Sequence, residues 1–218
     1  MRRLIRGKPR LGGVDKVFVN LCHGLDRLGI SYLVNLPFDK LRDEDRIGVL
    51  GRGRYSLQGY NRSNPIVAGI GLMTHPSEWP TVCEDYPVVR YLQHSEWTNN
   101  IYKQYYGDHC AIWPVGIDTD EWKPVSTSKD LDVMLYDKVM WNRPHYESAF
   151  LQPIRDALSR RKLKFAVLRY GNYMESEFRR LLARSKAMVF LCEHESQGLA
   201  YQECLSSNVP VLRGGPAK

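Results

Sequence analysis

The apolar residues of this chain recur at two spacings that alternate along the sequence. Between residues 14 and 28 they recur every three or four positions and stop at Gly29, which predicts an amphipathic helix over 14–28. A second helix is predicted from a cap at Ser95 through Tyr106, ending at Gly107. Short continuous apolar runs instead predict strands, here at 31–35, 47–50, 66–73, 88–92 and 111–113.

The same alternation restarts after a stretch that carries Pro and Ser residues. Strands are predicted at 132–136, 164–169, 187–191 and 209–212, and helices at about 147–161, 173–184 and 198–207, with Pro153 near a kink. Alternating strands and helices indicate parallel sheets. The sequence therefore predicts an α/β protein with an N-terminal Rossmann-like domain at 1–115, a linker at 116–130 and a C-terminal Rossmann-like domain at 131–218.

Composition narrows the class of protein. With 43% hydrophobic residues in 218, the chain can bury a core, which excludes disorder. It has no run of about 18 apolar residues and no apolar segment of a secretory signal at its basic start. Five scattered cysteines without a CxxC pair predict reduced thiols in the cytoplasm. The net charge of +7 indicates a phosphate-bearing partner.

Acidic residues follow the predicted strand 187–191, where core formation alone does not require them. The stretch FLCEHESQGLAYQECLSSNVPVL places Glu195 in a loop, Gly198 at a turn and Glu203 inside the next helix. In open α/β sheets, ligands bind beyond the carboxyl ends of the strands, where helix N-termini present N–H groups. The N–H groups of Gly198 and Leu199 could face a phosphate, while the carboxylates accept bonds from ribose and sugar hydroxyls. This chemistry is typical of a nucleotide-sugar site.

The segment EHESQGLAYQECLSSNVPVL resembles the Glu–seven–Glu motif of retaining glycosyltransferases of family 4. The residues in register with that motif are Glu195, Gly198, Leu199, Glu203, Pro210 and Val211. The chain departs from it at Ser196, Gln197, Ala200 and Asn208. RLGGVDKVFVNLCHGLDRLGI is similar to the glycine-rich loop and first helix of the same family, and PVGID to its interdomain turn. VMLYDKVMWNR offers Lys138 and Arg143 where relatives carry an Arg and a Lys beside the donor diphosphate.

The resemblance implies a GT-B architecture, in which two Rossmann-like domains with parallel sheets face each other across a cleft, the second being incomplete here. It implies transfer of a sugar from a nucleotide-diphosphate sugar to an acceptor hydroxyl, with retention of configuration and without a metal or a cofactor other than the donor. The implied catalytic residues are Glu195, Lys138, Arg143 and His75. The implied substrate-binding residues are Gly12, Gly13, Gly198, Leu199 and Glu203.

Plainer interpretations of these residues stay open. Lys138 and Arg143 could be ordinary surface charges, Gly12 and Gly13 only a turn, and His75 a structural histidine. Asp118 and Asp120 imitate a metal-binding D-x-D motif, but their place in the linker predicts turn and cap chemistry. The five tryptophans are expected to be packing residues rather than stacking platforms, although Trp141 lies close to the basic pair.

The expected partners are a nucleotide-sugar donor and an acceptor that is a saccharide, a lipid-linked sugar or a small molecule, with no nucleic acid. The alternative function is a non-catalytic nucleotide- or polyanion-binding module derived from such an enzyme. The chain ends soon after the strand predicted at 209–212, which should leave a sheet edge and apolar faces uncovered. We therefore expect self-association and weak transferase activity in a cytoplasmic protein, with peripheral membrane contact left open.

Overall fold

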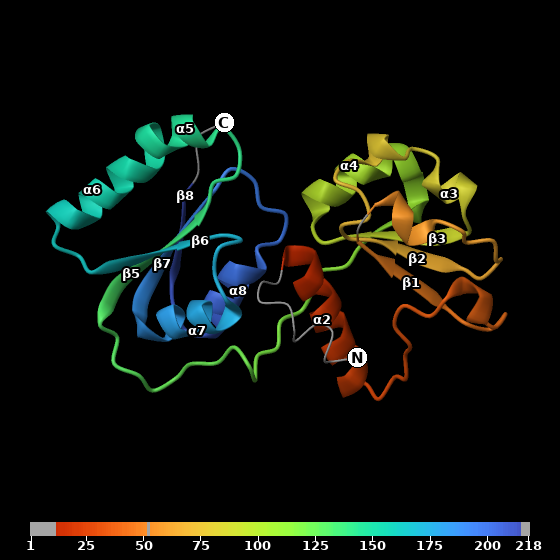
Figure 1. Cartoon of the computed structure of the whole chain (residues 1–218), viewed down its shortest axis with the longest axis horizontal. Coiled ribbons are helices and arrows are strands. Elements are labelled where there is room, and N and C mark those ends of the chain that lie inside the picture. Colours follow the sequence, from red (N-terminus) through yellow and green to blue (C-terminus); the bar gives the residue numbers. More distant parts are fainter. Residues whose placement is uncertain (1–11, 52, 215–218) are drawn as a thin grey trace. The chain divides into compact units, whose positions relative to one another are not determined.

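The computed structural model describes residues 12–51 and 53–214 (Figure 1). The described residues form two compact units: the first spans 13–116, and the second spans 117–214 together with Gly12. Each unit contains one four-stranded, fully parallel sheet. The α/β class and the two Rossmann-like parallel sheets predicted from the sequence are therefore confirmed. Within the described residues, no helix is both long and apolar enough to cross a membrane.

The first unit has the strand order β1-β2-β3-β4. Its helices and strands are α2 (Gly13–Arg27), β1 (Ile47–Leu50), β2 (Ile66–Gly69), α3 (Val82–Asp85), β3 (Val88–Gln93), α4 (Glu96–Tyr106) and β4 (Cys110–Ile112). Short 3-10 helices occur at Phe38–Lys40, Arg54–Leu57, Pro76–Glu78 and Gly107–His109. Aromatic packing dominates the core, in which the ring of Tyr91 stacks on that of Tyr102 at a centroid distance of 5.3 Å.

The first turn of α2 packs against glycines that follow β1 and β2. A Cβ atom at Gly51 would lie 2.5 Å from Cγ1 of Val14, and one at Gly71 would lie 2.6 Å from its Cγ2. Both glycines also have positive φ, which a residue with a side chain rarely adopts. These two positions therefore let α2 begin directly at the carboxyl ends of the strands.

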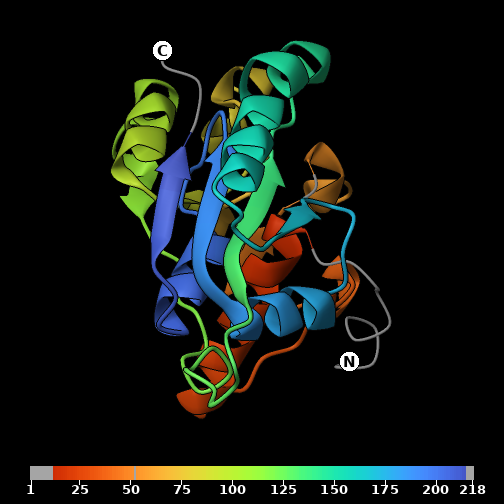
Figure 2. The ribbon, with the colours of Figure 1, turned by 90° about the vertical axis from the view of Figure 1, so that its left-hand side faces the viewer.

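The second unit has the strand order β6-β5-β7-β8, so the direction of winding reverses at β5. Its elements are β5 (Leu131–Lys138), α5 (Arg143–Tyr146), the π-helical turn η5 (Glu147–Leu151), α6 (Gln152–Arg160), β6 (Phe165–Arg169), α7 (Glu175–Arg184), β7 (Ser185–Cys192), α8 (Leu199–Ser206) and β8 (Val211–Gly214). Figure 2 shows α6 crossing the sheet on one face. The helices α7 and α8 supply the larger core on the opposite face.

The predicted elements differ from the structure in a few places. The strand predicted at 31–35 is wrong, because this segment is a loop in which Leu33 is 77% exposed and Asn35 adopts a left-handed conformation. The strand β2 ends at Gly69, four residues before the predicted end. The helix predicted at 147–161 begins earlier, at Arg143, and its π-helical turn stands just before Pro153, where the kink was predicted.

The segment 117–130, predicted as a linker, has no regular helix or strand but packs on the second unit. Trp122 is 5% exposed and its ring lies 5.5 Å from that of Phe178. The guanidinium of Arg179 stacks over the same indole at 4.2 Å. Lys129 Nζ donates to the carbonyl oxygen of Ser185 at 2.7 Å. The segment is therefore part of the second unit's core.

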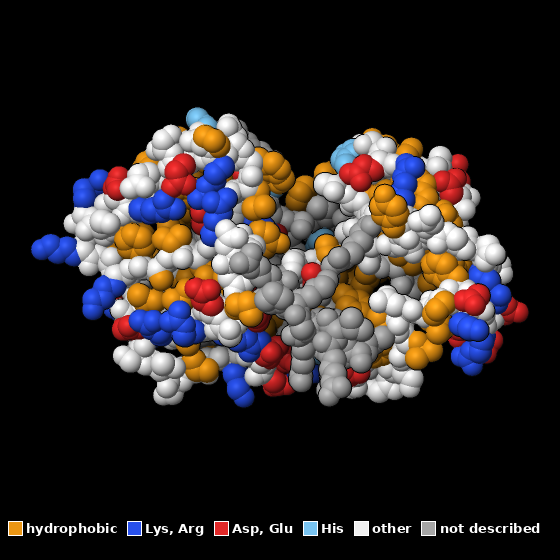
Figure 3. Space-filling model, in the orientation of Figure 1, with side chains coloured by type: hydrophobic (Ala, Val, Ile, Leu, Met, Phe, Trp, Pro, Cys, Tyr) orange, Lys and Arg blue, Asp and Glu red, His pale blue; other side chains and the backbone are white. Residues whose placement is uncertain are grey.

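Most of the excess positive charge belongs to the first eleven residues, which carry five Lys and Arg and no acidic residue. Residues 117–214 hold fifteen Lys and Arg against thirteen Asp and Glu, and residues 12–116 hold ten against eleven. On the face shown in Figure 3, basic side chains lie interspersed with acidic and apolar ones. The two units themselves are thus almost neutral.

One side of the second sheet is only partly covered. A groove of ≈ 290 Å³ lies between α6 and the strands β7 and β8, and its apolar lining includes Phe150 and Ile154. Leu212 on β8 is 68% exposed. The described residues thus include an apolar groove beside β7 and β8, and self-association stays a prediction.

Because Trp122 anchors 117–130 to the core, replacing it should destabilise the second unit. Trp122→Ala is expected to lower the free energy of unfolding by about 3–5 kcal/mol, as large-to-small core changes do. Urea denaturation followed by circular dichroism measures this. Trp97→Ala is the matched control, because that indole is 49% exposed. Equal stability of the two variants would mean that 117–130 is only a tether.

Candidate functional site

The candidate site lies where β5 and β7 end side by side. These strands are parallel neighbours, and Lys138, the last residue of β5, pairs in register with Cys192, the last residue of β7. Residues 139–142 form the loop after β5, and 193–198 form the loop after β7. The winding reverses at this point of the sheet, which is where open α/β sheets bind ligands.

Lys138 and Glu195 form an ion pair across the two loops. The Nζ atom of Lys138 lies 2.6 Å from Oε2 of Glu195, with side-chain exposures of 24% and 8%. The ammonium also lies 5.0 Å from the centre of the Tyr170 ring, beyond the end of β6. Both residues were predicted to belong to one site, and the structure brings them into direct contact.

A second carboxylate holds the loop after β5 in place. Glu193 accepts hydrogen bonds from the backbone N–H groups of Met140 (3.1 Å) and Trp141 (3.0 Å). The ring of His194 lies 5.4 Å from the Trp141 ring. Trp141 is 59% exposed, so the expectation that it is a packing residue is wrong. Sequence reasoning gave Glu193 no role, since its partners are backbone groups 52 and 53 residues away.

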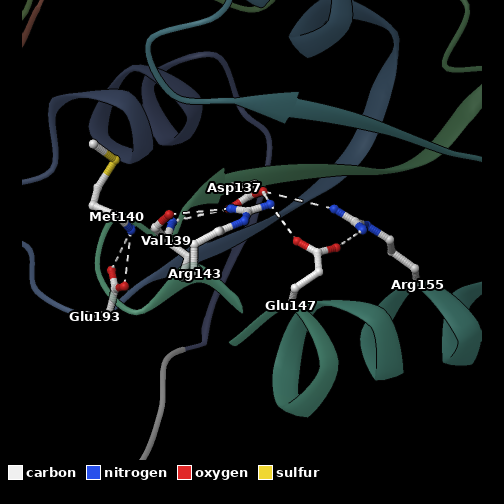
Figure 4. Close-up of polar contacts among 7 residues, drawn as sticks. All are labelled: Asp137, Val139, Met140, Arg143, Glu147, Arg155 and Glu193. Atoms are coloured by element: carbon white, nitrogen blue, oxygen red, sulfur yellow. Dashed lines mark hydrogen bonds and ion pairs between the residues drawn. The ribbon is translucent and has the colours of Figure 1, made fainter. Parts of the chain in front are cut away.

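Arg143 binds the buried carboxylate of Asp137 (Figure 4). Its two terminal nitrogens donate to Asp137 at 2.8 and 2.7 Å, and one also pairs with Glu147 at 2.8 Å. Asp137 is 1% exposed. Arg155 completes the cluster, with Glu147 as its close partner and Asp137 at 4.0 Å. The hydrogen bonds that Arg143 donates to Asp137 are the main cause that raises the pKa of the Arg143 guanidinium.

The composition of this cluster decides what Arg143 can do. Two guanidinium groups and two carboxylates balance each other's charge, and the donors of Arg143 point at Asp137 and Glu147. Of the two cations predicted to meet a diphosphate, Arg143 is therefore held by this cluster, whereas Lys138 pairs with Glu195 of the loop after β7. The sequence did not identify Asp137 as a partner of Arg143, because a single acidic residue at the end of an apolar run has no distinctive pattern around it.

Gly198 starts α8 in a left-handed conformation, with φ 75° and ψ 61°. A Cβ atom there would lie 1.8 Å from Cε1 of Tyr201, whose ring covers the glycine. Tyr201 packs edge-on against Phe190. Burial raises the pKa of Tyr201, and the negative charge of Glu195 adds to the effect. Leu199 is the first residue of the helix, as predicted.

Glu203 lies inside the second unit and not on its surface. It is 2% exposed on α8, among the core residues of the α7 and α8 face. The hydroxyls of Tyr136 and Tyr173 bond to each other at 2.6 Å nearby. Burial is the main cause that raises the pKa of both tyrosines, and the charge of Glu203 contributes in each case. A ligand would reach Glu203 only by displacing neighbouring side chains.

Of the residues predicted on the first unit, His75 has a local structural role. His75 caps the 3-10 helix Pro76–Glu78: its Nδ1 lies 2.8 Å from Oγ of Ser77 and its backbone N–H donates to Glu78 at 3.1 Å. Its side chain remains exposed. Gly12 precedes α2 and Gly13 is its first residue.

In 117–130, Asp118 shows the turn chemistry expected for it. Its Oδ1 accepts the backbone N–H groups of Asp120 at 3.0 Å and Glu121 at 3.3 Å. A groove of ≈ 500 Å³ lies beside the same segment, lined among others by Trp122 and Arg180. It contains none of the residues predicted to bind a donor.

No protein-family model matches the chain, and a search of curated proteins finds no match either.

Arg143→Ala should destabilise the second unit, because it leaves the buried carboxylate of Asp137 without its main hydrogen-bond donor. Breaking a buried ion pair costs about 3–5 kcal/mol, which urea denaturation would detect. Arg160→Ala is the control, since this residue is exposed in the last turn of α6. Unchanged stability with a loss of ligand affinity would show instead that Arg143 faces the ligand.

Gly198→Ala should also destabilise the unit. The left-handed conformation costs a residue with a side chain about 1–2 kcal/mol, and the Tyr201 ring must move as well. Gly116→Ala is the matched control, because a Cβ there meets nothing within 4 Å and φ is not positive. Thermal unfolding of both variants measures the difference. Equal midpoints would mean that the turn at 198 relaxes freely.

Proposed function

We propose that the chain is a retaining glycosyltransferase of family 4 with the GT-B fold, and that its donor site lies at the ends of β5 and β7. The observation that carries the proposal is the contact of Lys138 with Glu195, in the loop that leads to Gly198. A cation and a carboxylate at the start of a helix suit a ligand that has both phosphates and sugar hydroxyls. The Glu–seven–Glu resemblance of the same loop and helix supports the same ligand.

In the proposed reaction, the bond between the anomeric carbon and the diphosphate oxygen of the donor breaks. The acceptor hydroxyl oxygen forms a bond to the same carbon on the same face, and its proton leaves with the released nucleoside diphosphate. Lys138 neutralises charge that develops on this leaving group, and the N–H groups at Gly198 and Leu199 add to that stabilisation. Glu195 accepts hydrogen bonds from the sugar. The reaction proposed needs no metal.

The other predicted residues take different places in this proposal. Arg143 is a positioning residue, because it holds Asp137, the neighbour of Lys138, and makes no contact with the donor. Glu203 meets the ribose only after side chains around it move. His75, Gly12 and Gly13 belong to the acceptor side, where a saccharide, a lipid-linked sugar or a small molecule would bind.

Charge favours this enzyme over the alternative, a polyanion-binding module. The excess positive charge belongs mainly to residues 1–11, whereas 117–214 exceed neutrality by only two charges, from fifteen basic and thirteen acidic residues. Sugar hydroxyls can also donate hydrogen bonds to the carboxylate of Glu195, whereas the phosphates of a polyanion offer no donor.

A thermal-shift screen against UDP-, GDP- and ADP-sugars would identify the donor, and two variants test the site. Lys138→Ala should weaken donor binding about 10- to 100-fold, the loss of one charge-assisted hydrogen bond. Glu195→Gln should lower the affinity for the sugar nucleotide more than the affinity for the corresponding nucleoside diphosphate. Isothermal titration measures both.

Lys123→Ala serves as the control, because this lysine is exposed away from the site. Salt-sensitive retention of nucleic acid, with no binding of any sugar nucleotide, would favour the polyanion-binding module instead.

A further inference from the structure

Trp141 is a large aromatic side chain that the fold holds at the surface. Its side chain is 59% exposed, whereas Trp79 and Trp122 are 7% and 5% exposed in the two cores. Leaving an indole in water forgoes the free energy of burying it. A ligand that covers it would recover that free energy.

The backbone of this exposed residue is fixed. The carboxylate of Glu193 accepts the N–H groups of both Met140 and Trp141, and charged acceptors form strong hydrogen bonds. The next residue, Asn142, adopts a left-handed conformation with φ 42°. The His194 ring lies 5.4 Å from the indole on one side. The indole therefore belongs to a preorganised loop, which reduces the entropy lost on binding.

The indole and the ion pair come from the same two loops. Trp141 follows Lys138 by three residues, and its neighbour His194 directly precedes Glu195. Sugars present an apolar face of C–H groups and a rim of hydroxyls. An exposed indole suits the face, and a carboxylate suits the rim.

We propose that Trp141 is the platform on which the sugar ring of the donor stacks, while Glu195 binds its hydroxyls. The inference rests on the proposed function and deepens it, because it names the residue that recognises the sugar. The nucleobase is not the ligand of this platform. Met140, 54% exposed beside it, extends the apolar surface.

The test compares a sugar nucleotide with its nucleoside diphosphate by isothermal titration, using the donor that stabilises the wild-type chain most. Trp141→Ala should lower the affinity for the sugar nucleotide about tenfold, as expected for one lost aromatic contact. Its affinity for the nucleoside diphosphate should stay within about twofold of wild type. Trp141→Phe should retain most of the affinity. Trp97→Ala, which removes an indole of similar exposure from the first unit, should change neither.

Each other outcome overturns the inference. Equal losses of affinity for both ligands would mean that the indole stacks on the nucleobase. No loss of affinity would mean that the indole does not contact the ligand. A variant that binds normally but sediments as a smaller species would show that the indole covers a second copy of the chain. If the wild-type chain binds diphosphates and sugar nucleotides equally, the platform fails but a nucleotide site survives. If it binds neither, the proposed function fails and the inference with it.

Discussion

The second unit depends on how one buried carboxylate is compensated. Asp137 is 1% exposed near the end of β5, and an isolated charge there would be costly. Arg143 binds it with both terminal nitrogens, and Glu147 and Arg155 balance the remaining charge. Because Arg143 and Glu147 stand on α5 and the π-helical turn, the same contacts fasten the helix to the strand.

This constraint also separates the two charges at the end of β5. Successive side chains of a strand point to opposite faces. Asp137 therefore turns toward α5 and α6, and Lys138 turns the other way, toward Tyr170 and Glu195. The structural cluster and the candidate site share a strand end without sharing partners. The carboxylate of Asp137, which would otherwise compete with Glu195 for Lys138, is already neutralised by Arg143.

Local signals in the sequence were enough for much of the fold. The strand at 47–50 and the helix from Ser95 to Gly107 have strong local patterns, and both were predicted correctly. The segment 31–35 has an equally apolar pattern but remains a loop, because no strand of the sheet pairs with it. Apolar runs report strand propensity, whereas a strand also needs a neighbour.

The site was predictable only where a motif supplied it. Lys138 and Glu195 were placed together through the resemblance, and they meet. The pairing of Arg143 with Asp137 and the burial of Glu203 depend on which face of a strand or helix each occupies, and the exposure of Trp141 depends on backbone bonds to Glu193. Such contacts between distant segments leave no trace in local spacing.

The pair of Lys138 with Glu195 has a consequence for which ligands can enter. Because the ammonium is already neutralised, a small inorganic anion must compete with an internal carboxylate and leaves that carboxylate without a partner. A ligand that supplies anionic oxygen and hydroxyl groups together satisfies both side chains at once. At the proposed donor site, the closed pair is therefore expected to disfavour simple inorganic anions and to favour ligands of mixed character.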